Sequence, residues 1–362
     1  MTRAASEFVG AITFEAVTGR PVHAEIFAAG QALDHIRLAR EANVIVVAPA
    51  TADFIARSTH GHADDLLTAC LLAATCPVLL VPAMNDRMWS HVQTKRNIEH
   101  ARSLNYEILE PAVGALAVGE GSGPGRMPEP EEILARIGRL LENDGLLKGR
   151  SVLVTAGATR EEIDPVRFIS NYSSGRMGIE IARAAVRRGA NVTLITGHVE
   201  VAPPPGVNLL KTVSAAEMRE AVGKALSSAD ALIMAAAPAD FRPAASAPQK
   251  IKKGKSKAAV DLENTDDILV STAPLRPKGC IVVGFALETE NGLENARQKL
   301  ESKKLDLVVL NHAGEPGAGF GSDTNRVTLI SKDGRVEELP LLPKSEVADR
   351  LLDRLGKLFS AR

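Results

Sequence analysis

Residues Ser151–Gly178 read SVLVTAGATREEIDPVRFISNYSSGRMG, and this stretch decides the fold of the chain. It opens with the apolar run Ser151–Val154, which is typical of a buried strand. Apolar residues at helical spacing after Gly175 predict a helix that ends at Gly189, and residues 191–195 predict a second strand. A strand, a helix and a second strand in this order predict a parallel sheet.

The connection between this first strand and its helix is long and polar. A dinucleotide-binding fold turns tightly here through G-x-G-x-x-G, whereas residues 159–174 place Arg160, Arg167, Asn171 and Ser174 before the helix. Backbone N–H groups and the positive end of the dipole at a helix N-terminus favour anions. The stretch therefore predicts an anion-binding site.

Strand and helix patterns alternate on both sides of this stretch, which predicts an α/β protein with parallel sheets. The predicted helices cover residues 24–42, 51–74, 90–104, 131–141 and 291–304, and the predicted strands cover 44–47, 77–81, 231–235, 281–285 and 306–310. Residues 327–339 predict a hairpin. A turn-rich joint at 143–149 marks the domain boundary, which we place between residues 145 and 146.

The chain has 362 residues, enough for two domains, and its 43 Lys and Arg against 44 Asp and Glu give a formal charge of −1. This balance gives no case for a nucleic-acid partner. The cysteines Cys70, Cys76 and Cys280 are too few for a disulfide framework, and no signal segment is visible, so we expect a cytoplasmic protein. No apolar run approaches the ~20 residues of a membrane span.

Residues 155–178 resemble the ligase half of the bifunctional phosphopantothenoylcysteine decarboxylase / phosphopantothenate–cysteine ligase family of coenzyme A biosynthesis. The shared pattern is T-A-G-A-T-x-E-x-I-D-P-V-R-F-I-S-N-x-S-S-G-R-M-G. Further segments of the second half match the same family, namely A-A-x-A-D-F-R-P-A, K-I-K-K, G-F-A-x-E-T and K-x-x-D-x-V-V-x-N. The resemblance implies a Rossmann-like, doubly wound ligase domain over residues 146–362.

The resemblance also implies a reaction. The carboxylate of 4′-phosphopantothenate attacks the α-phosphate of CTP, pyrophosphate leaves, and the amine of L-cysteine displaces CMP from the acyl cytidylate. Two anions must meet, which requires cationic side chains and Mg²⁺. By resemblance Arg167 binds anionic substrate groups, Asn171 polarises the acyl carbonyl, and Lys250 neutralises charge. The metal ligands are not predicted.

The nucleotide site is predicted by the same resemblance together with position. Asn85, Asp240, Phe285 and Asn311 follow predicted strands, and ligands of parallel α/β sheets bind beyond the carboxyl ends of strands. The residues expected to bind CTP are Ala236, Asp240, Phe285, Lys299 and Lys303. The simpler readings are that Phe285 is a core aromatic and that Lys250, Lys252 and Lys253 form a solvated charge run.

The first half, over residues 1–145, resembles the flavin-dependent decarboxylase of the same family, with a flavodoxin-like or Rossmann-like domain. By resemblance His35 and Asn85, the latter in P-A-M-N-D-R-M-W, are catalytic. Segments around Thr51 and around Asp64 and Asp65 match parts that bind FMN. His60 and His62 lie beside these carboxylates, but no cysteine or further histidine joins them, so we predict no metal site there.

Two departures from the family concern this flavoprotein half. The family begins with a strand and a glycine-containing turn that hold the FMN phosphate, and Met1 begins after that unit, so we expect an incomplete domain with little bound FMN. A missing strand also exposes a sheet edge, which favours a homo-oligomer. Val118 stands where the family has the cysteine that completes reduction of the enethiol intermediate.

Two alternatives remain open from the sequence. One keeps the ligase and makes the first half a scaffold that only oligomerises. The other is a nicotinamide-dependent Rossmann oxidoreductase, against which residues 155–178 lack G-x-G-x-x-G and no acidic residue directly follows the strand ending at Ile195.

Overall fold

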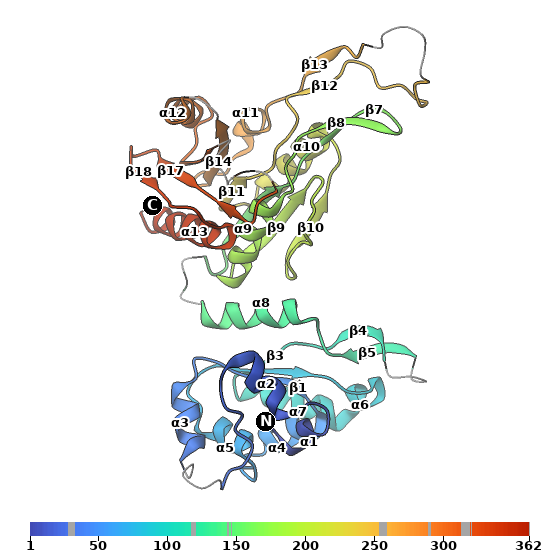
Figure 1. Cartoon of the computed structure of the whole chain (residues 1–362), viewed down its shortest axis with the longest axis vertical. Helices are drawn as coiled ribbons and strands as arrows, with labels where there is room; N and C mark the ends of the chain where they lie inside the picture. Colours follow the sequence, from blue (N-terminus) through green and yellow to red (C-terminus); the bar gives the residue numbers. More distant parts are fainter. Residues whose placement is uncertain are drawn as a thin grey trace. The chain divides into compact units, whose positions relative to one another are not determined.

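The computed structural model in Figure 1 shows two compact units, Met1–Leu141 and Glu142–Arg362. The structure describes residues 1–27, 33–116, 121–142, 145, 147–252, 259–288, 291–312, 319 and 321–361. The predicted boundary at residue 145 lies close to this division and stays a prediction. No helix in the described part of the chain is long and apolar enough to cross a membrane.

The first unit is built on a parallel sheet of β1 (Ile45–Ala50), β2 (Val78–Pro82) and β3 (Tyr106–Ile108), in the order β1-β2-β3. A separate antiparallel hairpin joins β4 (Ala112–Ala115) to β5 (Ser122–Arg126). β2 is buried along its whole length, as expected for a central strand covered on both faces.

Short helices surround this sheet. They are α1 (Arg3–Ser6), α2 (Ala11–Thr18), α3 (Asp34–Glu41), α4 (Ala52–Thr59), α5 (Leu66–Ala73), α6 (Asp86–Ser90), α7 (Val92–Ser103) and α8 (Pro130–Leu141). Two predicted helices were wrong in extent. The helix predicted over 24–42 begins only at Asp34, and residues 21–27 are not helical. The helix predicted over 51–74 is broken, because the Asp65 side chain accepts the amide of Thr68 and starts α5 anew.

The second unit contains an eight-stranded sheet in the order β10-β9-β6-β11-β14-β15-β17-β18. Its strands are β6 (Ser151–Ala156), β9 (Asn191–Thr196), β10 (Asn208–Lys211), β11 (Ala231–Met234), β14 (Ile281–Glu288), β15 (Leu307–His312), β17 (Val327–Ser331) and β18 (Val336–Glu338). The first six are parallel, and β17 and β18 run antiparallel to their neighbours. When the six parallel strands are numbered by their order in the chain, their order across the sheet is 3-2-1-4-5-6, as in the Rossmann fold. The switch point of this order lies between β6 and β11.

Helices cover both faces of this sheet, as the doubly wound prediction requires. On one face α9 (Arg176–Arg187) and α13 (Lys344–Ser360) share a core with Val152 and Val154 of β6. On the other, α10 (Ala215–Leu226), α11 (Ile268–Ser271) and α12 (Gly292–Ser302) share a core with Leu153 of the same strand. Alternate residues of β6 thus enter two separate cores, which explains its unbroken apolar run.

Three antiparallel pairs of short strands lie outside the large sheet in the described part of the second unit. The segment 159–174, predicted as a polar connection, contains β7 (Arg160–Asp164) paired with β8 (Arg167–Ser170). A second hairpin pairs β12 (Phe241–Pro243) with β13 (Leu262–Asn264), and β16 (Thr324–Asn325) pairs with β19 (Leu342–Pro343), with β17 and β18 between them in the chain. Figure 1 shows the first two extending beyond the large sheet as arms.

Helix α9 packs unusually close to β6, and Gly178 makes this possible. A Cβ atom at Gly178 would lie 2.6 Å from the Cβ of Ala156 and 2.8 Å from the carbonyl oxygen of Thr155. Both neighbours belong to a buried central strand that cannot move aside easily. The glycine therefore fixes how near the helix start lies to the end of β6.

We predict that Gly178→Ala lowers the free energy of unfolding by about 1–3 kcal/mol, the usual cost of overpacking a core. The control is Gly223→Ala in α10, where the new Cβ would meet only the flexible Cδ1 of Leu275 at 3.3 Å. The control should be neutral or stabilise by up to about 1 kcal/mol, because alanine favours a helix. Equal urea midpoints for both variants would contradict the close packing.

Candidate functional site

The second unit has a cavity of about 380 Å³ at the carboxyl ends of its central parallel strands. Residues singled out from the sequence line it, namely Asn171, Ser174, Ala236, Asp240, Phe285, Lys299, Lys303 and Asn311. Phe285 and Asn311 lie within β14 and β15 rather than after them, because both strands run further than predicted. The cavity also takes in residues that the sequence did not single out, among them Asp267, Arg176 and Lys344.

One wall of the cavity is the N-terminus of α9. Its N-cap, Gly175, has φ of 77° and makes no side-chain cap hydrogen bond to the first turn, while the amide of Gly175 itself is accepted by Ser173 Oγ at 3.4 Å. A Cβ at this position would lie 2.5 Å from the Cγ1 of Val199, which leaves room only for glycine. The positive end of the twelve-residue helix suits an anion.

The loop after β11 forms a second wall and is tied to the loop after β6. Thr155 Oγ1 accepts the amide of Ala236 at 3.1 Å, and Thr159 Oγ1 accepts the amide of Ala239 at 2.9 Å. Asn171 Nδ2 donates to the carbonyls of Ala237 and Pro238 at 2.9 and 3.1 Å. Asn171 therefore spans from the β8 side to the β11 loop, and its predicted role toward an acyl carbonyl stays a prediction.

The third wall carries lysines that are held by neighbours within the unit. Lys299 Nζ donates to the carbonyl of Phe285 at 2.6 Å, and Lys303 Nζ lies 2.5 Å from Asp267 Oδ2. Burial would raise the pKa of Asp267, but hydrogen bonds from Lys303 and from backbone amides outweigh it and keep that pKa below its ordinary value. The carboxylate therefore holds Lys303 in place at neutral pH.

Two further cations stand near the start of α9. Lys344 is almost fully buried, and its Nζ donates to the carbonyls of Gly319 and Ser322 at 3.1 and 2.6 Å. Burial lowers the pKa of Lys344, and neighbouring Arg176 acts in the same direction. Arg176 itself pairs with Asp323. This end of the cavity is thus positive, which again suits an anionic ligand.

Arg167 and Lys250, two of the predicted catalytic residues, are not among the residues that line the cavity. Arg167 opens β8, and its guanidinium binds the buried carboxylate of Asp164. Lys250 is exposed and precedes Ile251, which is bonded to this pair. Lys253 lies outside the described residues.

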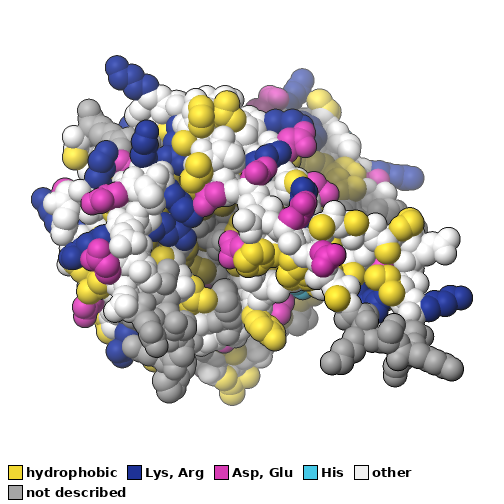
Figure 2. Space-filling model, turned by 90° about the horizontal axis from the view of Figure 1, so that it is seen from above, with side chains coloured by type: hydrophobic (Ala, Val, Ile, Leu, Met, Phe, Trp, Pro, Cys, Tyr) yellow, Lys and Arg dark blue, Asp and Glu magenta, His cyan; other side chains and the backbone are white. Residues whose placement is uncertain are grey.

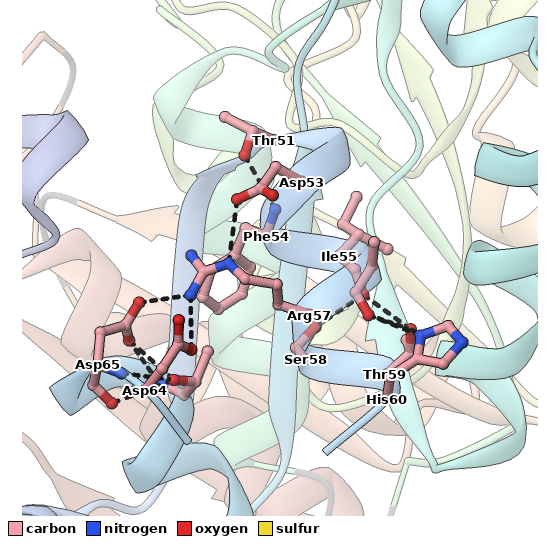
Figure 3. A network of polar contacts seen from close by, with 12 residues as sticks. Thr51, Asp53, Phe54, Ile55, Arg57, Ser58, Thr59, His60, Asp64 and Asp65 are labelled. Carbon is pink, nitrogen blue, oxygen red and sulfur yellow. Dashed lines mark hydrogen bonds and ion pairs between the residues drawn. The ribbon is translucent and has the colours of Figure 1, made fainter. Parts of the chain in front are cut away.

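In the first unit, the residues predicted to bind FMN belong to a network centred on Arg57 (Figure 3). Arg57 contacts Asp53, Asp64 and Asp65 at 3.0, 3.1 and 2.8 Å, and its pKa is raised chiefly by the hydrogen bond to Asp65. Thr51 Oγ1 accepts the amide of Phe54 and caps α4. These side chains are engaged within the protein, so their observed role is to fix the helix starts that follow β1.

The two predicted catalytic residues of the first unit have unused polar atoms. His35 lies in α3, and its Nδ1 is buried without a hydrogen-bond partner. Asn85 caps α6 through Oδ1, which accepts the amide of Arg87 at 2.9 Å, so that side chain keeps its amide donors for another group. In the described part of the chain, no three His, Cys, Asp or Glu side chains are grouped to hold a metal.

Comparison with known proteins matches both units. Residues 147–358 match the family described as DNA/pantothenate metabolism flavoprotein C-terminal domain, and residues 1–142 match the family described as Flavoprotein. The coenzyme A biosynthesis bifunctional protein CoaBC of Mycobacterium tuberculosis (strain ATCC 25618 / H37Rv) is 47% identical over 369 residues, which cover 98% of this chain and 88% of that protein. The chain belongs to the CoaBC family.

Two further relatives bear on the two units of this CoaBC family member. A solved C-terminal domain of a CoaBC protein superposes with a TM-score of 0.51 at 39% identity and covers 60% of this chain and 100% of that domain. A cysteine/cysteine sulfinic acid decarboxylase from an unknown prokaryotic organism is 41% identical, covering 95% of this chain and 98% of that protein. The predicted two-domain α/β fold and the family resemblance are confirmed.

The expectation of an N-terminally incomplete flavoprotein domain is not supported by these matches. The Flavoprotein family matches from residue 1, and the alignment takes in 88% of the mycobacterial relative. Val118, where the family resemblance predicts a cysteine, lies outside the described residues.

Sequence reasoning missed the residues that hold the predicted ones in place. Asp164 stood in the quoted motif, but its partner Ile251 lies 87 positions away in the chain, so no local pattern links them. Asp267 was visible as an N-cap before an apolar run, since its side chain accepts the amide of Val270. Lys344 gave no signal, because a lysine at a helix start is ordinarily a surface residue.

Proposed function

We propose that the second unit is a CTP-dependent ligase that joins 4′-phosphopantothenate to L-cysteine, and that the first unit decarboxylates the product in coenzyme A biosynthesis. The observation that carries the ligase proposal is the cavity at the β6–β11 switch point. An uncapped helix N-terminus and several basic side chains meet there beside the carboxyl ends of parallel strands. That arrangement suits a nucleotide whose phosphates lie at the helix start.

The reaction requires activation of a carboxylate, which is a poor acylating agent. The carboxylate oxygen of 4′-phosphopantothenate forms a bond to the α-phosphorus of CTP, and the bond to pyrophosphate breaks. The cysteine amine then forms the amide bond, and CMP leaves with the electron pair of the broken acyl–oxygen bond. The first step brings two anions together, and the second develops negative charge on the carbonyl oxygen and on the leaving CMP, so fixed positive charge lowers both barriers.

In this proposal, different residues bind the nucleotide, neutralise charge and contact the reacting carbonyl. Phe285 and Lys299, joined by a hydrogen bond of 2.6 Å, bind the nucleotide from β14 and α12. The start of α9 receives phosphate oxygens, and Lys250 neutralises charge while the acyl cytidylate forms. Asn171, which follows β8, and Ala236, which follows β11, place polar groups beside the reacting carbonyl.

Mg²⁺ fits this site as a companion of the triphosphate. Protein sites for Mg²⁺ commonly supply one or two carboxylates and leave the other positions to phosphates and water. Asp240 is exposed and lines the cavity, which makes it the candidate carboxylate. The metal would lower the charge of the leaving pyrophosphate.

We predict that Lys250→Gln lowers the rate of pyrophosphate release from CTP and 4′-phosphopantothenate by roughly 100-fold when cysteine is absent. The reason is the loss of a positive charge that opposes the developing charge on the phosphates. The measurement is a coupled pyrophosphate assay with purified protein.

The control for this variant is Lys278→Gln, which removes an exposed lysine just before β14, at the amino ends of the strands. Its rate should equal that of the wild type. An unchanged rate for Lys250→Gln would show that the lysine run is only a solvated loop. A nucleotide panel in the same assay separates the alternatives, because CTP should support the reaction and NAD should not bind.

For the first unit we propose FMN-dependent decarboxylation of 4′-phosphopantothenoylcysteine, with His35 and Asn85 at the site. The cofactor fits the carboxyl ends of β1 and β2, after which Thr51 and Asn85 stand. FMN, when bound, supplies the oxidation of the substrate thiol. Asn85 can donate to the substrate carboxylate, and the buried Nδ1 of His35 can exchange a proton.

We predict that the product of this unit is mainly the enethiol rather than the saturated thiol, 4′-phosphopantetheine. Val118 has no proton to donate where the family resemblance places a cysteine. Mass spectrometry of the product, with FMN and air supplied, measures this. Val118→Cys should raise the share of the saturated thiol, and His35→Ala should abolish CO₂ release.

A wild-type protein that forms only 4′-phosphopantetheine would contradict the assignment to Val118. If FMN is retained and no CO₂ is released from 4′-phosphopantothenoylcysteine, the first unit serves as a scaffold for the ligase. Free cysteine is a second substrate worth testing in the same assay, given the relative named as a cysteine decarboxylase.

We also propose that the chain forms a homo-oligomer through the arms of the second unit. Figure 2 shows hydrophobic side chains gathered on the arm at the right of the view. Phe241 and Leu262, each about half exposed, lie on one face of the β12–β13 hairpin, because Leu262 pairs with Pro243. Exposed apolar groups of this kind mark protein–protein contacts.

We predict that Leu262→Asp shifts the protein toward the monomer in sedimentation equilibrium. A buried charge at an apolar contact is costly, whereas the arm itself does not need this side chain to fold. The matched control is Arg242→Gln, which removes an ion pair with Glu263 on the other face of the hairpin. A wild-type protein that sediments as a monomer would overturn the proposal.

A further inference from the structure

Asp164 is a fully buried carboxylate at the turn between β7 and β8 (side-chain exposure 0%). Its two oxygens have separate partners. Oδ1 accepts the amides of Val166 and Arg167, both at 2.9 Å, which closes the turn. Oδ2 accepts Arg167 Nε at 2.9 Å, Arg167 Nη2, and the amide of Ile251 at 3.1 Å. The hydrogen bonds that close the turn use only Oδ1, which leaves Oδ2 to bind the guanidinium of Arg167 and the amide of Ile251.

Arg167 completes a bridge from this carboxylate to the segment that carries Lys250. Its Nη2 also donates to the carbonyl of Ile251 at 2.8 Å. Ile251 is therefore held through both its N–H and its C=O groups, one by Asp164 and the other by Arg167. These two hydrogen bonds fix the backbone next to Lys250 against the β7–β8 hairpin, although the two segments are more than eighty residues apart in the chain.

The same contacts orient the guanidinium of Arg167. Of its five N–H donors, those on Nε and Nη2 point toward Asp164 and Ile251, and Nη1 makes no hydrogen bond to any residue that the structure describes. The arginine side chain is 48% exposed, so its Nη1 edge can meet an anion from solvent. The hydrogen bonds from Arg167, with those from backbone amides, hold the pKa of Asp164 well below its usual range. The carboxylate stays ionised at every pH at which the enzyme would work.

We propose that Asp164 is a positioning residue of the ligase, which sets Arg167 and Lys250 at one place on the hairpin. The inference rests on the proposed function, because it assigns these two cations to the anionic substrates of that reaction. Asp164 does not touch substrate. It acts by keeping one edge of Arg167 free and by anchoring the backbone beside Lys250.

The variant Asp164→Asn tests this selectively. The asparagine Oδ1 can still accept the two turn amides, whereas Nδ2 cannot accept from Arg167 or from Ile251. Hydrogen–deuterium exchange in the peptide that contains Ile251 should become about tenfold faster. Exchange in β6 and β9 should not change. An unchanged exchange rate at Ile251 would overturn the proposed anchor.

The kinetic arm uses pyrophosphate release from CTP and 4′-phosphopantothenate. Asp164→Asn should lower kcat by about 10- to 100-fold, because displacement of a charged group by about 1 Å has such effects. The KM for 4′-phosphopantothenate should not rise, since removing a carboxylate leaves the site more positive. The control Glu162→Gln changes an exposed carboxylate on β7 and should leave both constants as in the wild type.

A double-mutant cycle decides whether Asp164 acts through Lys250. Combined with Lys250→Gln, Asp164→Asn should lower the rate little further than Lys250→Gln alone. Fully additive losses would overturn the proposal even if both single variants are slow. If Asp164→Asn loosens all of β7 and β8, Arg167→Gln keeps both Asp164 oxygens and should still speed exchange at Ile251. A wild-type protein that releases no pyrophosphate refutes the ligase function, whereas the exchange experiment still tests the anchor.

Discussion

The structure of the second unit depends on the junction between the loops that follow β6 and β11. The two strands pair in parallel, and beyond their ends Ala237 N donates to the carbonyl of Gly157 at 2.8 Å. Thr155 and Thr159 accept amides of the β11 loop from the other side. Hydrogen bonding between these two segments thus continues past the ends of the strands, where ligands of this fold bind, and it fixes two walls of the cavity. The closely packed α9 supplies the third element, because Gly178 lets the helix start beside the end of β6.

The central strands and their order were accessible from the sequence for a physical reason. Parallel strands buried on both faces are continuous apolar runs, such as Val152–Val154, and they are recognised without knowledge of their partners. The arms were not predicted, because the polar residues of β7 and β8 carry no alternating apolar pattern. The helix predicted over 51–74 was wrong in extent for a local reason: Asp65 caps a new helix inside a pattern that is typical of one long helix.

In the candidate site, too, the sequence reveals what has a local pattern and misses what depends on contacts between distant segments. Asp240 was named from its position at a strand end and Lys299 from the family resemblance, and both line the cavity. Arg167 and Lys250 could be named from the family pattern, but their geometry depends on Asp164, whose contacts join distant segments. Long-range hydrogen bonds of a buried carboxylate have no period and no local spacing. They appear only when the chain is folded.

Three of the basic side chains described in this unit are paired with carboxylates before any ligand arrives. Lys303 is held by Asp267, Arg176 by Asp323, and Arg167 by Asp164. Pairing reduces the net positive charge of the site, but it also orders the long side chains, whose immobilisation on binding would otherwise cost about 0.5–1.5 kcal/mol each. The start of α9 differs from these cations, since its dipole cannot rotate away and its N-cap, Gly175, makes no side-chain cap hydrogen bond. Selectivity for a phosphate chain would then come from this fixed dipole, with the paired cations adding charge at set positions around it.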